Sequence, residues 1–122
     1  MAERFAAAGW QVWVSDVDAK GLSDLSTDWR SSRVDVSNEE EMIAMFADIS
    51  EAWGGLDAVC ANAGVAGPTA KVEDVALEDW RMTQSVNVEG VFLTAKHAIP
   101  LMKSQGKGSF TITSSTAGNY GF

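Results

Sequence analysis

Residues 56–64 read LDAVCANAG, a short apolar run that leads directly into small and polar residues. The run at 56–61 predicts a buried strand, and the loop at 62–68 opens with Asn-Ala-Gly. Small residues at the carboxyl end of a parallel strand allow a ligand to lie against the backbone, but Asn-x-Gly taken alone is also an ordinary turn. The stretch therefore predicts a strand followed by either a turn or a ligand-binding loop.

Helical patterns flank this strand on both sides. Before it, Ser37 and Glu40 have the spacing of a capping box, and the predicted helix ends at Gly54. Its apolar stripe, which we expect to be core packing, consists of Met42, Met45, Phe46, Ile49 and Trp53. After the strand, residues 77–104 predict a long helix, which Pro100 should kink or end early.

Further strands are predicted from short β-prone runs at residues 11–15, 33–36 and 109–114. The composition favours a helix at 2–8 and a weak helix at 19–30. This alternation of short strands with helices indicates an α/β layered fold with a parallel sheet. We find no internal repeat, low-complexity tract or linker, which is consistent with one domain.

Composition and charge exclude several classes of protein. The 122 residues are 46% hydrophobic and 21% charged, unlike a disordered tail or a coiled coil. No apolar run approaches the roughly 20 residues that cross a bilayer, and Glu3 is unlike the start of a secretory signal. The formal charge of −8 would repel nucleic acid and anionic lipid. We therefore expect a soluble, cytoplasmic protein.

Asp16, at the end of the first predicted strand, is the most informative single residue. In a dinucleotide-binding fold, an acid at this place hydrogen-bonds the adenosine ribose hydroxyls. Its charge would also repel a 2′-phosphate and so select NAD over NADP. The alternative is that Asp16 is simply a solvated strand-end residue.

Two further polar features follow the later strands. Residues 113–115, Thr-Ser-Ser, present hydroxyls at the end of the last strand. Asn87 lies inside the long helix, where a short amide is mildly unfavourable. It therefore either faces solvent or does a task such as holding water at a bend. His97 is expected at the surface near the helix C-terminus, Cys60 in the core, and no metal site is expected.

Taken together, these segments resemble the short-chain dehydrogenase/reductase family. Five motifs occur in the family's order over nearly the whole chain: Asp16, Asp35-Val36, ANAG at 61–64, helical Asn87, and SSTAG at 114–118. The family usually has two asparagines before Ala-Gly, and the first of them is alanine here.

The resemblance implies an incomplete Rossmann-like, doubly wound parallel sheet of about four strands. It also implies an oxidoreductase that transfers hydride between NAD(H) and an alcohol or carbonyl substrate. The implied cofactor-binding residues are Asp16, Asp35, Val36, Asn62, Ala63 and Gly64. Ser115 would hydrogen-bond the substrate oxygen, and Asn87 would position a water in the proton relay.

The same resemblance indicates parts of the enzyme outside these residues. The family's glycine-rich turn would precede residue 1, and its catalytic Tyr and Lys would follow Phe122, because Tyr120 is too close to Ser115. The family's first strand would separate the first and third strands of this chain, whose edges would then lie about 10 Å apart. We therefore expect a partial NAD-binding domain, truncated at both ends, that is poorly soluble and inactive alone. The complete enzyme would be a homodimer or homotetramer.

Two alternatives remain open. The chain could be a non-catalytic Rossmann-like binding or interaction module, which would never have had the catalytic tyrosine. It could also be a fold relative such as a sugar-nucleotide epimerase, although the Asn-Ala-Gly and Ser-Ser-Thr-Ala-Gly segments argue against that reading.

Overall fold

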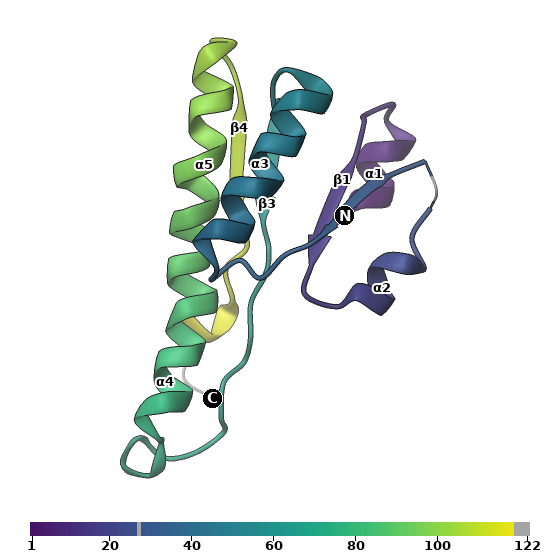
Figure 1. Cartoon of the computed structure of the whole chain (residues 1–122). Helices are drawn as coiled ribbons and strands as arrows, with labels where there is room; N and C mark the ends of the chain where they lie inside the picture. The colour runs from purple at the N-terminus through teal and green to yellow at the C-terminus, as the bar shows by residue number, and fades with distance from the viewer. Residues whose placement is uncertain (27, 119–122) are drawn as a thin grey trace. The chain divides into compact units, whose positions relative to one another are not determined.

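A computed structural model describes residues 1–26 and 28–118, and the chain divides into two compact units, Met1–Asp35 and Val36–Phe122. Each unit contains a two-stranded parallel sheet with helices beside it, which gives a partial Rossmann-like α/β fold. The strand pairs are β1–β2 and β3–β4, and no ladder joins the two pairs within the described part of the chain. Figure 1 shows the elements.

The first unit consists of α1 (Ala2–Ala7), β1 (Trp13–Asp16), α2 (Ala19–Ser23) and β2 (Arg30–Arg33). The strands are in register from Trp13 opposite Arg30 to Asp16 opposite Arg33. The Trp13 indole N–H donates to the Ser32 hydroxyl at 2.9 Å, and the Arg30 guanidinium lies over the Trp13 ring. These side-chain contacts add to the main-chain pairing of two strands that contain no buried residue.

Two predictions in this unit were wrong. The second strand covers Arg30–Arg33 and not 33–36, because main-chain pairing with β1 orders a polar segment. Val34 follows the strand, is buried, and donates its main-chain N–H to the Asp16 carbonyl at 2.9 Å. The helix predicted at 19–30 ends at Ser23.

The second unit begins with α3 (Glu39–Trp53) and β3 (Ala58–Ala61). A short 3₁₀ helix, η1 (Val72–Asp74), precedes a continuous helical rod. The rod is formed by α4 (Leu77–Gln84), the π-helical turn η2 (Ser85–Glu89) and α5 (Gly90–Ser104). The chain continues through β4 (Ser109–Ile112) to the 3₁₀ turn η3 (Thr116–Gly118).

The core of this unit lies between α3, α5 and the β3–β4 pair. Figure 1 shows α3 and α5 side by side along the strands. The predicted stripe of α3 is buried except for the half-buried Trp53. The buried apolar residues are Met42, Met45, Phe46, Ile49, Leu56, Ala61, Leu93, Ala98 and Met102.

Three details differ from the sequence predictions. The cap of α3 is Asn38 and not Ser37: its Oδ1 accepts from the N–H groups of Glu40 and Glu41. Pro100 does not end α5 early, which was one of the two predicted outcomes, and the helix runs on to Ser104. His97 is not at the helix end or fully exposed: it is half-buried, stacks on Phe46, and its Nε2 lies 3.1 Å from Glu39 Oε1.

Glu39 links the first turn of α3 to α5, because its carboxylate also accepts from Lys96 Nζ at 2.6 Å. The hydrogen bonds from Lys96 and then His97 lower the pKa of Glu39 below its ordinary value of 4.5. A lowered pKa means that the ionised carboxylate favours the folded state. That contribution is present above the ordinary pKa and is lost as the pH falls through the folded-state pKa.

We expect Glu39→Gln to lower the free energy of unfolding at neutral pH by a small amount, because the carboxylate is exposed to solvent. The difference from the unsubstituted chain should shrink at an acidic pH below the folded-state pKa of Glu39, where the carboxyl group is protonated in both the folded and the unfolded state. Urea unfolding at the two pH values measures it, with Glu40→Gln as the control from the same helical turn. A difference that persists at acidic pH would contradict this assignment.

Candidate functional site

The carboxyl ends of β3 and β4 lie at the same edge of their sheet, because the two strands are parallel. Asn62 follows β3, and Thr113 follows β4. The Thr113 hydroxyl donates to Asn62 Oδ1 at 2.9 Å, and the Thr113 N–H donates to the Ala61 carbonyl at 2.9 Å. The structure therefore brings the Asn-Ala-Gly loop and the Thr-Ser-Ser segment together at this edge.

Ser115 lies two residues beyond this contact and is exposed. Its Oγ accepts the N–H of Ala117 at 3.2 Å, and its carbonyl accepts the N–H of Gly118 at 3.1 Å. Because the backbone N–H occupies one lone pair of the hydroxyl oxygen, the O–H proton remains available as a donor.

Asn87 lies in the middle of the π-helical turn η2. Its Oδ1 accepts from the main-chain N–H of Val65 at 2.8 Å, and its Nδ2 donates to the Val65 carbonyl at 2.9 Å. The amide thus pairs with both polar groups of one loop residue, which accounts for a short amide in this long helix. Single-turn π segments occur frequently at functional sites.

The same loop is also closely packed against α4 at Gly67. Gly67 has a φ of +71°, and a Cβ there would lie 2.8 Å from Thr83 Oγ1. The Thr83 hydroxyl in turn donates to the Asp79 carbonyl at 2.8 Å. A side chain at 67 would be strained and crowded, so the loop needs glycine there. Neither Thr83 nor Val65 was identified from the sequence, because a threonine in a helix and a backbone partner leave no distinctive signal.

The residues predicted to bind the adenosine end of the cofactor lie mostly in the first unit. Asp16 ends β1, is exposed, and accepts the N–H of Asp18 at 3.0 Å through Oδ1. Asp35 follows Val34, whose N–H bonds to the Asp16 carbonyl, so it lies near the end of β1. Val36 begins the second unit and packs against the start of α5 at Gly90.

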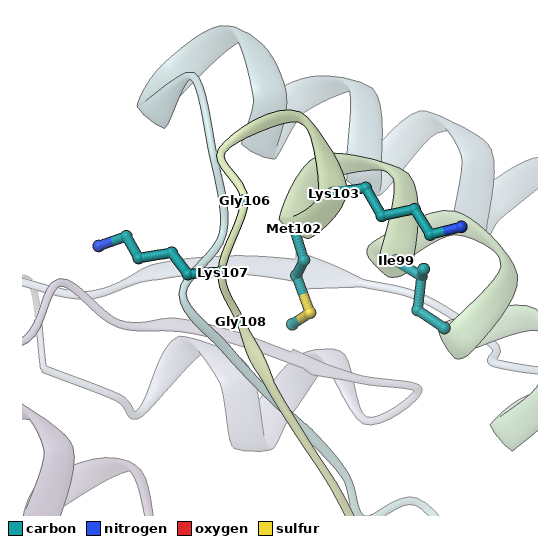
Figure 2. Close-up of a pocket in the computed structure, with 6 residues that line it drawn as sticks. All are labelled: Ile99, Met102, Lys103, Gly106, Lys107 and Gly108. Atoms are coloured by element: carbon teal, nitrogen blue, oxygen red, sulfur yellow. The ribbon is translucent and has the colours of Figure 1, made fainter.

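An open cavity of about 330 Å³ lies elsewhere in the second unit, between the end of α5 and the beginning of β4. Figure 2 shows its lining, which consists of Ile99, Met102, Lys103, Gly106, Lys107 and Gly108. The lining residues precede β4, whereas Ser115 follows it, and Asn62 follows β3. The cavity is therefore at the opposite end of the strands from the predicted site residues.

Among residues 1–26 and 28–118, no three His, Cys, Asp or Glu side chains gather as metal ligands. Cys60, predicted in the core, is half-buried and unbridged. Tyr120 lies outside the described residues. No helix in the described ranges has both the length and the apolar character of a membrane span.

Comparison with known proteins gives a consistent result. The family model described as Enoyl-(Acyl carrier protein) reductase matches residues 1–122. Cis-4-hydroxycyclohexanecarboxylate dehydrogenase of Sinomonas cyclohexanicum is 33% identical over 128 residues, covering 99% of this chain and 49% of that protein. The NADP-dependent (R)-specific alcohol dehydrogenase of Lentilactobacillus kefiri is 34% identical over 122 residues, with 95% and 48% covered.

A solved structure of NAD⁺-bound xylitol dehydrogenase superimposes with a TM-score of 0.94 at 28% identity, covering 99% of this chain and 50% of that one. The chain thus spans about half the length of the relatives that it matches.

Proposed function

Because this chain belongs to the short-chain dehydrogenase/reductase family of oxidoreductases, we propose that the whole protein transfers hydride between NAD(H) and an alcohol or carbonyl substrate. The observation that carries the proposal is the double attachment of the 62–68 loop. At Asn62 it is bonded to the segment that bears Ser115, and at Val65 it is bonded to Asn87. One loop therefore links the two residues proposed to act on the substrate.

Two features of the predicted cofactor-binding residues fit a dinucleotide. Asp16 is exposed at a strand end and has a carboxylate oxygen that no hydrogen bond within the described residues uses. Asn62, Ala63 and Gly64 are small or polar and exposed, so a ligand can lie against their backbone. Bound NAD would supply or accept the hydride; Asp16 would hold the adenosine ribose, and residues 62–64 would line the cofactor cleft.

In the proposed reaction, Ser115 donates its O–H to the substrate oxygen and so favours the charge that develops there. Asn87 retains one N–H on Nδ2 and one lone pair on Oδ1 after its bonds to Val65. These groups can hold a water molecule that passes the proton onward.

We also propose that residues 1–122 alone do not turn over NAD. In the short-chain dehydrogenase/reductase family, proton exchange with the substrate needs a tyrosine and a lysine that follow the catalytic serine in the sequence. Tyr120 is the single tyrosine of these residues, and no lysine follows it. Incubating the chain with NAD and secondary alcohols while following NADH absorbance tests this proposal, and measurable NADH would refute it.

For the whole protein, NAD-dependent oxidation of secondary alcohols, or reduction of the matching ketones, tests the proposed activity. Nucleotide binding without turnover of any alcohol or carbonyl would favour a binding module instead.

Cofactor choice is proposed to favour NAD, because the Asp16 carboxylate would repel a 2′-phosphate. Asp16→Ala in the whole protein is expected to improve kcat/KM for NADP relative to NAD by at least about tenfold, since it removes one close like-charge contact. Asp24→Ala, an exposed acid of the same unit, is the control. An unchanged ratio of NAD to NADP use would refute the role of Asp16.

The proposed partners are small molecules and further copies of the same protein, in the cytoplasm. Large apolar side chains are exposed along the helical rod of the second unit: Leu77, Trp80, Met82, Val88, Phe92 and Ile99. Their presence on one rod supports the proposal of a homodimer or homotetramer that forms through this rod. No nucleic-acid or membrane partner is proposed, because the charge of −8 opposes both.

A further inference from the structure

Thr113 joins the two strand ends through both its main chain and its side chain. Its N–H continues the β3–β4 ladder by donating to Ala61, and its hydroxyl donates to the amide oxygen of Asn62. Both Asn62 and Thr113 are exposed, so water could satisfy either side chain. The hydrogen bond between the Thr113 hydroxyl and the Asn62 amide is therefore not needed to pair a buried polar group. Its effect is to orient the Asn62 amide.

An asparagine amide has one oxygen acceptor and two N–H donors on opposite branches of the same planar group. Because the Thr113 hydroxyl donates to Oδ1, the oxygen branch faces Thr113 and the Nδ2 branch faces away from it. We propose that Thr113 is a positioning residue that fixes the Asn62 amide so that Nδ2 offers its N–H donors to an oxygen acceptor of the bound nucleotide. This inference rests on the proposed function, in which Asn62 lines the cofactor cleft.

The residue type suits this task. A β-branched side chain has restricted χ1 freedom, so the hydroxyl is directed at its partner before any ligand arrives. Serine would keep the hydroxyl with more rotational freedom, and valine would keep the shape without the donor. Thr111 provides a matched control, because it is an exposed threonine on β4 whose hydroxyl makes no hydrogen bond within residues 1–26 and 28–118.

The test compares Thr113→Val, Thr113→Ser and Thr111→Val in the whole protein. Losing one orienting hydrogen bond should raise the KM for NAD about tenfold in Thr113→Val, with kcat changed less than about twofold. Thr113→Ser should stay within about threefold of the unsubstituted protein, since it keeps the donor. Thr111→Val should have the same KM for NAD and the same kcat as the unsubstituted protein. An unchanged KM in Thr113→Val, or an equal rise in Thr111→Val, would overturn the inference.

A second measurement separates this inference from the proposed function. In the absence of nucleotide, the two side-chain N–H signals of Asn62 in an NMR spectrum should be dispersed, and Thr113→Val should bring them closer together by freeing the amide. Protein that shows this change but never binds NAD would refute the proposed function while preserving the orienting role of Thr113. Signals that are identical in the two proteins would refute the orienting role, whatever the cofactor result.

Discussion

Replacing Ser115 by alanine in the whole protein is expected to lower kcat/KM for the alcohol substrate about 100- to 1000-fold, the cost typical of removing one donor to a developing oxyanion. The loss should fall mainly on kcat, because a hydrogen bond to the substrate oxygen strengthens as negative charge develops on it. Steady-state kinetics with saturating NAD measures the split. The NAD affinity should change little, since Asp16 and residues 62–64 are proposed to bind the cofactor.

Ser114→Ala is the matched control for this prediction. Ser114 is the neighbouring exposed serine, but its hydroxyl makes no hydrogen bond in the described part of the chain, whereas Ser115 Oγ is oriented by the Ala117 N–H. If the two alanine variants lose activity equally, the effect belongs to the segment as a whole, and the specific role of Ser115 is wrong. Thermal unfolding of both variants shows whether a loss of folded protein contributes to any loss of activity.

The sequence was most informative where burial follows a regular period. The strand predicted at 56–61 contains β3. The apolar stripe of α3 is largely buried, because its side chains recur at helical spacing and therefore share the one face of the helix that packs on the core. The strand at Arg30–Arg33 was missed for the converse reason. Its pairing with β1 is made by the main chain, and its side chains are polar and mostly exposed.

The geometry around Asn87 was beyond prediction for a different reason. The sequence showed that the residue was unusual in a helix, but its partner Val65 is 22 residues away and contributes only main-chain atoms. No side-chain pattern marks such a partner. The register of the α3 cap was also one residue off, because Ser37 and Asn38 are both good capping residues and the wider structure decides between them.

Asn87→Ala in the whole protein is expected to lower kcat/KM about 100-fold, within the range attributed to a positioned proton-transfer group. The substitution removes both hydrogen bonds to Val65 and the amide groups proposed to hold the relay water. The attachment of the loop can be followed separately from catalysis. Hydrogen exchange of the Val65 amide should accelerate about 30-fold, since two hydrogen bonds worth about 1 kcal/mol each are lost.

Asn87→Asp distinguishes the two tasks of the residue. It retains an oxygen that can accept from the Val65 N–H, but it places a second, charged oxygen opposite the Val65 carbonyl, where the amide N–H now lies. Because two acceptors cannot pair, we expect the loop to loosen and the activity to fall at least as far as in Asn87→Ala. Glu89→Gln, from the same π-helical turn, should leave both measurements unchanged. Full activity together with rapid exchange at Val65 would show that catalysis does not depend on the attached loop, and the role of Asn87 would have to be abandoned.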